Sequence, residues 1–438
     1  MKKIYLVFMI VLSATFFSFS QIKRCGTTEL YDIHRQQNPV LDIVREQMEI
    51  AGKKWRENPS LNKNGNSLIT IPVVVHVVYN ADSLQQNIPD SCIFSQLEVL
   101  NEDFRRLNAD SGNVRSLFDS LASDIQIEFC FASTDTNGNP TNGITRTATS
   151  VKAFEFFNNQ QDDMKFTSKG GEDAWSKDKY LNIWTCYMTI FNSPGVLGYS
   201  HFPWDTADSK DGVVLLYNTV GRYNKVFEMP EGKGKTATHE VGHWFGLFHI
   251  WGNESFFPGC DSSDYVDDTP NQSGQSNFDC NKTINSCSNE SPFWNPFNPP
   301  DLVENYMDYS NDTCMCMFSS GQKDRMLSFL NTARAALFNS NGCAGFSAAP
   351  EFFNNDFNFR ISPNPSVGNV VVFSSSNQKE QKADIEILNL LGQKIFKKNN
   401  AGIPMELNLS SLPSGYYFIE ISNGKTQKTL PLILSERK

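Results

Sequence analysis

Residues 238–251 read THEVGHWFGLFHIW, and they hold three of the six histidines of the 438-residue chain. Their spacing is H-E-x-x-H-x-x-G-x-x-H. On a helix, His239 and His243 are four residues apart, so both imidazoles project from one face toward a single ion. Gly246 can adopt the left-handed conformation that ends a helix, which lets His249 approach the same ion from another side. The stretch therefore predicts a metal site with three histidine ligands.

The chemistry expected at this site is hydrolysis. Three neutral imidazoles suit zinc and leave a fourth position for water, which is typical of catalytic rather than structural zinc. Glu240 adjoins the first ligand and is placed to reach that water. Zinc lowers the pKa of the water toward roughly 7, and a carboxylate removes its proton during attack on a carbonyl. We expect Glu240 to be the general base of an amide hydrolase.

The sequence around the motif predicts one mixed α and β domain over residues 67–343. A β-branched run from Ser67, LITIPVVVHVVY, suits a strand buried on both faces. Residues 93–107 space their apolar side chains as a helix does. Further strands are expected at 125–133, 180–188, 195–204 and 211–218, and a further helix at 321–338. Residues 260–300 lack periodicity, so we expect an irregular segment held by disulfides or a cation.

Three further stretches form a set with the histidine motif HEVGHWFGLFH: CDSSDYVDDTP, NYMDYSNDTCMCMF and GQKDRM. Together they resemble the pappalysin-type metzincins, over about Ser67 to Cys343. The resemblance implies a two-lobed α+β, or α/β-like, catalytic domain with zinc at the bottom of a horizontal cleft. It also implies endopeptidase activity on proteins and calcium dependence. The three histidines match the family's zinc ligands, and Glu240 matches its base.

The same resemblance suggests roles for Met307 and Tyr309, which lie downstream of the histidine motif. Met307 lies at a suitable distance for the turn methionine beneath a metzincin zinc site. Tyr309 matches the tyrosine near the oxyanion of the tetrahedral intermediate, although a packed tyrosine in a turn is the plain alternative. Asp312 follows closely and could attract a basic residue just after the scissile bond.

The acidic segment after the motif offers several oxygen ligands within six residues. Calcium prefers carboxylate and carbonyl oxygens at flexible geometry. We therefore expect a calcium site there, with a solvated acidic turn as the alternative. The candidate ligands are Asp264, Asp267, Asp268 and Thr269.

Ten cysteines in an exported chain are expected to be mostly paired. The family pattern implies two disulfides in the irregular segment, Cys260 with Cys287 and Cys280 with Cys314. Cys316 is extra to that pattern, and Cys343 is its suggested partner. The cysteines left without assignment are Cys92, Cys130 and Cys186.

The N-terminus predicts export and a removable pro-segment. Residues 1–20 place two lysines before a short apolar run and small residues, as a signal peptide does, and no other stretch could cross a bilayer. Residues 21–66 are polar, with a helical stretch at 39–55, and a helical lead-in to the next domain is the alternative. Cys25 could block the zinc as a thiolate until cleavage between Lys53 and Asn66, unless it is a disulfide partner or a free thiol.

The C-terminus predicts a separate module. Residues 344–358 form an Asn-rich and Phe-rich linker, and 359–438 alternate short strands with turns, which favours a small all-β, Ig-like sandwich. The stretches ISPNPSVGNV, IEILNLLGQKI and LPSGYYFIEISNGKTQKTLPLI resemble the C-terminal sorting domain of type IX secretion. The resemblance implies passage through the periplasm, transfer by the type IX machinery and removal of the module. A carbohydrate-binding or protein-binding domain is the alternative.

The sequence is interpreted as a secreted zinc endopeptidase, extracellular or at the cell surface, that acts on proteins or peptides. The net charge of −10 and pI near 5.2 argue against a nucleic-acid partner, which would call for clustered Lys and Arg. A surface adhesin on a vestigial protease scaffold is one alternative, disfavoured by the intact Glu240. Hydrolysis of a non-peptide substrate at the same zinc is another.

Overall fold

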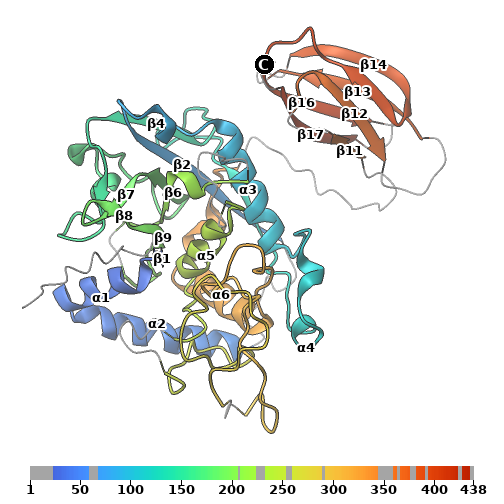
Figure 1. The fold of residues 1–438 in the computed structure, drawn as a ribbon. Coiled ribbons are helices and arrows are strands. Elements are labelled where there is room, and N and C mark those ends of the chain that lie inside the picture. The colour runs from blue at the N-terminus through green and yellow to red at the C-terminus, as the bar shows by residue number, and fades with distance from the viewer. Residues whose placement is uncertain are drawn as a thin grey trace, which may run out of the picture. The chain divides into compact units, whose positions relative to one another are not determined.

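The protein is described by a computed structural model that divides into two compact units, residues 1–346 and 347–438 (Figure 1). The predicted signal peptide and the predicted linker lie outside the described residues. The described residues are 23–58, 68–205, 208–222, 232–252, 259–288, 292–343, 359–362, 366–374, 381–389, 393–422 and 427–434.

A seven-stranded sheet forms the centre of the first unit. Its order is β1-β9-β10-β6-β2-β3, and β4 also pairs with β2. Only β9 and β10 run antiparallel; every other pair is parallel. The β-branched run forms β2, which is buried along nearly its whole length, as its composition predicted. The strands are β1 (Lys23–Cys25), β2 (Ile69–Asn80), β3 (Ile127–Phe131), β4 (Ile144–Thr149), β6 (Leu181–Cys186), β9 (Val196–Ser200) and β10 (Val213–Leu216).

Three helices belong to the same unit as this sheet. α3 (Asp90–Phe104) and α5 (Lys235–Trp244) pack on each other and on strands of the sheet. α6 (Ser320–Thr332) is the last α-helix among the described residues. Ser319 and Gln322 form a reciprocal capping box at the start of α6, which satisfies two backbone donors there. No helix within the described ranges is long and apolar enough to span a membrane.

The smaller elements of the first unit connect these layers. A second sheet contains β5 (Phe154–Glu155), β7 (Met188–Ile190) and β8 (Ser193–Pro194), and α4 (Ser116–Asp119) is a single turn. Short 3-10 turns lie at Leu84–Gln86, Ser111–Asn113, Asp163–Lys165, Thr167–Lys169, Tyr217–Thr219 and Ala335–Asn339.

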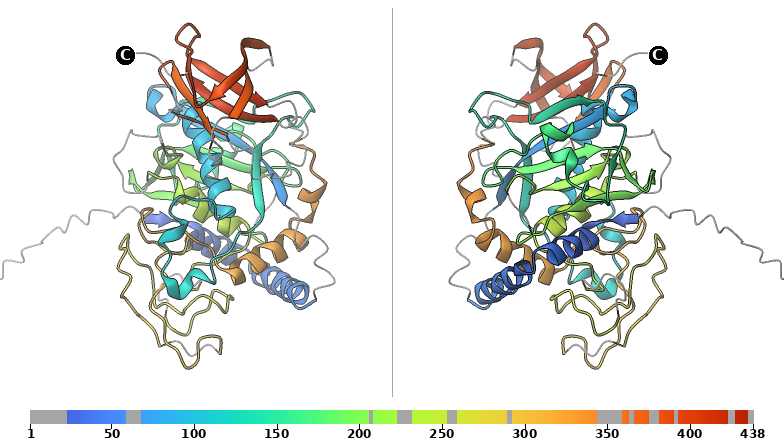
Figure 2. Two further views of the ribbon diagram at one scale, coloured as in Figure 1. Left: turned by 90° about the vertical axis from the view of Figure 1, so that its right-hand side faces the viewer. Right: turned by 90° about the vertical axis from the view of Figure 1, so that its left-hand side faces the viewer.

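The N-terminal segment lies against the rest of the first unit through three elements. β1 adds to the edge of the large sheet, parallel to β9, with Cys25 opposite Gly198. Helix α1 (Thr27–Gln37) was not expected from the sequence, whereas α2 (Val40–Arg56) matches the predicted helical stretch. α2 packs beside α6, as the two side views show (Figure 2), and Glu49 forms a double ion pair with the buried Arg325.

Disulfides hold the irregular segment and the end of the first unit. Cys260 is bonded to Cys287 and Cys280 to Cys314, as the family pattern implied. The suggested pair of Cys316 with Cys343 is wrong, because Cys343 is bonded to Cys130, 213 residues earlier. The sequence could not show this, since the two halves meet only after folding. The free cysteines are Cys25, Cys92, Cys186 and Cys316, and all four are buried.

The second unit is a β domain of two antiparallel sheets, ordered β11-β12-β15 and β14-β13-β16-β17. Alternate apolar side chains from both sheets, such as Val370, Ile385 and Ile419, share one hydrophobic core. The strands are β11 (Phe359–Ser362), β12 (Asn369–Ser374), β13 (Gln381–Leu388), β14 (Lys394–Ile403), β15 (Met405–Asn408), β16 (Gly415–Ser422) and β17 (Gln427–Leu434).

Candidate active site

Helix α5 and the turn after it bring the three histidines of the motif together. His239 and His243 lie one turn apart on the helix, which ends at Trp244. Gly246 then has φ +93°, and a Cβ there would collide with the ring of Phe329. Only glycine suits both conditions. The chain therefore reverses at this point and returns His249 to the other two rings.

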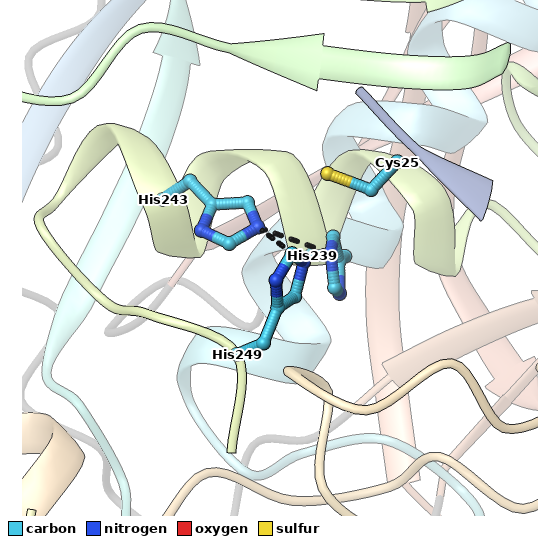
Figure 3. Close-up of side chains that lie close together, drawn as sticks. All are labelled: Cys25, His239, His243 and His249. Atoms are coloured by element: carbon cyan, nitrogen blue, oxygen red, sulfur yellow. Dashed lines mark hydrogen bonds between the residues drawn. The ribbon is translucent and has the colours of Figure 1, made fainter. Parts of the chain in front are cut away.

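The three imidazoles converge on one point (Figure 3). His243 Nε2 lies 3.1 Å from His239 Nε2 and 3.1 Å from His249 Nε2. Each Nδ1 faces an oxygen: Tyr306 O at 2.6 Å for His239, Leu247 O at 2.7 Å for His243, and Thr28 Oγ1 at 3.3 Å for His249. These outer contacts favour a proton on Nδ1 and a lone pair on Nε2.

This donor set fits a divalent metal ion. Burial lowers the pKa of all three imidazoles, that of His243 to about 3, so the rings are neutral. Three lone pairs that face one another in a buried site call for a cation between them. Their separation is close to the ~3.3 Å edge of a tetrahedron with zinc–nitrogen bonds of about 2.0–2.1 Å.

Cys25 completes the same group of donor atoms. Its Sγ lies with the three histidine nitrogens, all four side chains being buried, and Figure 3 shows the sulfur directed from β1 toward the rings. The thiol also contacts Glu240 Oε2 at 3.4 Å, and the Thr27 hydroxyl donates to that oxygen at 2.9 Å. Burial raises the pKa of Glu240 to about 8. The N-terminal segment therefore places a thiol beside the three histidine nitrogens and a hydroxyl donor on the Glu240 carboxylate.

Met307 and Tyr309 flank the histidines from the turn before α6. Met307 is fully buried under α5, and a Cβ on Gly242 would lie only 2.5 Å from its sulfur. Tyr309 packs edge-on against His249, with ring centroids 4.9 Å apart, and its hydroxyl donates to Cys25 O at 3.2 Å. Both residues therefore lie at the histidine cluster.

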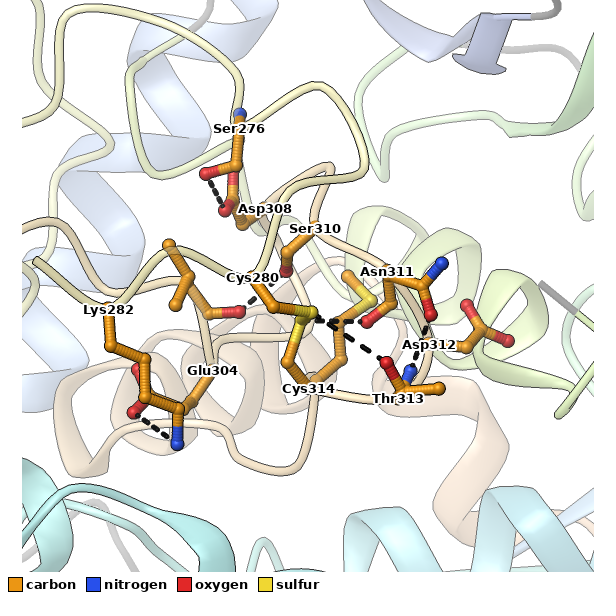
Figure 4. Close-up of a disulfide and its surroundings, with 12 residues drawn as sticks. Ser276, Cys280, Lys282, Glu304, Asp308, Ser310, Asn311, Asp312, Thr313 and Cys314 are labelled. Carbon is orange, nitrogen blue, oxygen red and sulfur yellow. Dashed lines mark hydrogen bonds and ion pairs between the residues drawn. A yellow bond between two sulfur atoms is a disulfide. The ribbon is translucent and has the colours of Figure 1, made fainter. Parts of the chain in front are cut away.

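Arg24 makes a buried ion pair that the sequence did not reveal. Its Nη2 donates to Asp312 Oδ1 at 2.6 Å, and its Nη1 donates to Ser310 O at 3.0 Å. Both side chains of the ion pair are fully buried. Asp312 lies two residues before the Cys314 half of the disulfide in Figure 4, and its other oxygen accepts from the backbone N–H of Lys235 at the start of α5.

Comparison with known proteins identifies the family. Residues 165–331 match the peptidase family described as pregnancy-associated plasma protein-A. An extracellular metalloprotease of Pyricularia oryzae is 32% identical over 275 residues, which are 61% of this chain and 77% of that protein. One of Colletotrichum graminicola is 31% identical over 305 residues, 68% of this chain and 89% of that protein. The chain belongs to the pappalysin family.

Solved structures extend this result to the fold. A mutant of promirolysin from Tannerella forsythia matches with a TM-score of 0.60 and 39% identity, over 74% of this chain and 99% of that chain. Mature mirolysin with a cleaved peptide matches with a TM-score of 0.56 and 43% identity, over 64% and 98%. This pappalysin therefore has a mirolysin-like metalloprotease fold of mixed α and β content. It is a secreted zinc metalloendopeptidase, and the adhesin alternative finds no support.

The C-terminal residues of this pappalysin match a second family. Residues 360–435 match the secretion system C-terminal sorting domain. This match fits the extracellular location of the related proteases, and it explains why a β domain without a part in the histidine cluster follows the catalytic sequence.

The acidic segment of this pappalysin does not gather the four expected calcium ligands. Asp264 is buried and accepts from Thr269 Oγ1 at 2.7 Å, whereas Asp267 is exposed. Asp268 accepts from Ser319 Oγ at 2.6 Å and from the backbone of Gly321. Calcium at this segment stays a prediction.

Proposed function

We propose that His239, His243 and His249 hold the catalytic zinc and that Glu240 and Tyr309 carry out the proton and charge steps of peptide hydrolysis. The observation that carries this proposal is the convergence of three buried Nε2 atoms at 3.1 Å. When bound, zinc supplies a Lewis acid that activates water and polarises the scissile carbonyl. The side chain of Met307 packs against α5 at Gly242.

The protein groups then divide the chemistry between them. Glu240 takes the proton of the attacking water and passes it to the leaving amine, which requires its carboxylate to be free of other donors. The Tyr309 hydroxyl donates to the oxyanion that develops on the carbonyl. In the latent chain both groups are engaged by the N-terminal segment, through Thr27 and the Cys25 carbonyl.

Substitution of Glu240 tests the assignment of the base. Glu240→Ala removes the proton acceptor but none of the three nitrogen ligands, so zinc content should stay unchanged while peptide hydrolysis falls by about 10²-fold or more. The measurement is zinc content and initial rate on the activated protein. A variant that keeps its turnover would refute Glu240 as the base.

We also propose that residues 21–66 are a pro-segment that keeps the enzyme latent through Cys25. A thiolate is a good zinc ligand and would displace the catalytic water. Support comes from the buried position of Cys25 among the histidines and from the absence of a disulfide at this cysteine. The parallel pairing of β1 with β9 places the segment along the edge strand next to α5. Cleavage after α2, which ends at Arg56, would release it.

Arg24 supports a preference for basic residues in substrates. In the latent chain its guanidinium fills a buried position against Asp312, close to the zinc ligands on α5. A buried site that offers a carboxylate to one guanidinium nitrogen and a backbone carbonyl to another recognises arginine well. We propose that Asp312 binds the basic residue that follows the scissile bond once Arg24 has left.

The remaining assignments concern export and calcium. We propose that residues 1–20 are a signal peptide, 67–343 the catalytic domain, 344–358 a linker, and 359–438 an Ig-like sandwich that addresses the chain to type IX secretion. The match of residues 360–435 to a sorting domain supports the last point. We further propose that calcium binds at the acidic segment. Burial raises the pKa of Asp264 to about 7, a cost that a cation would offset.

A further inference from the structure

A second cluster of histidines and carboxylates joins the pro-segment to the catalytic part. His34 lies on α1, and His201 and Asp205 follow strand β9. One donor atom from each of the three lies within 4.8 Å of the others. Among the described residues, histidine, cysteine and carboxylate donors gather in this way at just one other place, the catalytic cluster.

The two histidine rings of the second cluster stack much as one ring pair of the catalytic cluster does. The rings of His34 and His201 are stacked at 5.3 Å and 20°, and those of His239 and His249 at 5.2 Å and 28°. Asp205 bridges the first pair, with Oδ1 at 3.0 Å from His34 Nδ1 and Oδ2 at 3.4 Å from His201 Nδ1. These separations bracket the ~3.3 Å expected between ligands of tetrahedral zinc.

Buried atoms without hydrogen-bond partners point into this cluster. The side chains of His201 and Asp205 are 0% and 1% exposed, and His34 is 11% exposed. His201 Nε2 donates to Asp162 Oδ1 at 3.0 Å, which fixes a proton on that nitrogen. His201 Nδ1 and Asp205 Oδ2 have no hydrogen-bond partner among the described residues. A second ring proton or a metal cation between His201 Nδ1 and Asp205 Oδ2 would satisfy both atoms.

The charges around the cluster leave Asp205 in need of a positive partner. Asp162 is paired with Lys165 at 3.0 Å and Lys210 at 3.1 Å. Asp205 has only the two imidazoles as ion-pair partners within the described ranges.

We propose that His34, His201 and Asp205 bind a second divalent metal ion of the zinc class in the latent protein. Two imidazoles and one carboxylate are donors that zinc accepts. Asp162 is not a ligand, but it accepts a hydrogen bond from His201 and so orients the ring, as carboxylates around metal-binding histidines commonly do. One of the three ligands comes from the proposed pro-segment. The ion therefore tethers α1 to the end of β9, and removal of the pro-segment dismantles its site.

The metal content of the full-length chain tests this proposal. The proposal rests on the part of the proposed function that makes residues 21–66 a pro-segment, and it does not depend on catalytic activity. Glu240→Ala serves as the background because it prevents self-cleavage. We expect about two zinc ions per chain by elemental analysis after removal of weakly bound metal, and about one in the His34→Gln variant. Arg35→Gln, a change at the next residue of α1, should keep about two. A failure of the catalytic site would instead lower the content of all three proteins.

One zinc ion in both the background protein and His34→Gln would overturn the proposal. The alternative is that a second proton on the His201 ring, rather than a metal ion, lies between His201 and Asp205. This alternative predicts one zinc ion per chain and release of α1 as the pH rises. If His34→Gln does not fold, Asp205→Asn provides the same comparison from the catalytic side. Hydrogen exchange of residues 27–37 gives a second readout: zinc withdrawal, which also removes the ion beside Cys25, should lower protection more in the background protein than in His34→Gln.

Discussion

Tyr309 is engaged by the N-terminal segment in this structure, and we expect it to lose that partner on activation. In the latent chain its hydroxyl donates to the Cys25 carbonyl, and its ring packs on His249 and Trp251. Departure of β1 removes that acceptor but leaves the ring packing within the catalytic part. The hydroxyl is then held in place, beside the metal ligands, without a fixed partner. This is the arrangement that an oxyanion donor needs.

Tyr309→Phe should lower kcat of the activated enzyme by roughly 10²–10³-fold, because removal of one oxyanion donor costs about 2.7–4 kcal/mol. KM should change little, since the contact forms only in the transition state. Steady-state kinetics on a peptide substrate measures both constants. Zinc content is the control, and unchanged kinetics would return Tyr309 to a packing role.

Asp312 should set the preference for the residue after the scissile bond. Asp312→Asn keeps the size of the side chain but removes the charge that pairs with Arg24 in the latent protein. We expect kcat/KM for substrates with Arg at that position to fall by about 10-fold or more, and those with Ala to change little. Sequencing the products of a diverse peptide mixture measures the shift. Equal losses for both substrates would mean that Asp312 acts through the start of α5 instead.

At the scale of elements, local patterns were predictable and distant pairings were not. The helical spacing of α3, the continuous β-branched run of β2 and the motif on α5 all depend on neighbours in the sequence, and the motif predicted the histidine cluster. α1 was missed because its buried face meets residues remote in the chain. The ion pair of Arg24 with Asp312 spans 288 residues. The His34 cluster was missed for the same reason, because Asp205 lies 171 residues after His34.

The acidic segment acts on a neighbouring element, since Asp268 accepts from the first turn of α6. Negative charge at a helix N-terminus stabilises that helix, and a bound calcium would order the carboxylates that supply it. A calcium-selective chelator, at a level that spares zinc, should lower the thermal midpoint by several degrees and expose residues 260–287 to proteolysis. Re-addition of calcium is the control. A constant midpoint would favour a plain acidic turn.

On the scale of the whole catalytic unit, the proposed latency depends on other contacts of the N-terminal segment as well as on the Cys25 thiol. The N-terminal segment is bound along its described length: β1 pairs with β9, α1 reaches His201 and Asp205, and α2 is clamped to α6 by Glu49 and Arg325. Each contact brings the next one to a high local concentration. Loss of the thiol should therefore weaken the block at the zinc before it frees the whole segment.

Cys25→Ala in the full-length chain should show this partial loss of latency. The thiol lies with the three histidines, so its removal opens the coordination position for water, while Arg24 and the two helices still hold the segment against the rest of the unit. We expect hydrolysis of a short peptide at least about 10-fold above the unprocessed parent, equivalent to about 1.4 kcal/mol, but below the activated enzyme. Mass spectrometry must show that the chain is uncut during the assay. Cys92→Ala, which removes another buried free cysteine, should stay latent. If Cys25→Ala is as inactive as the parent until it is cut, latency rests on Arg24 and the helices, and the thiol only fills space.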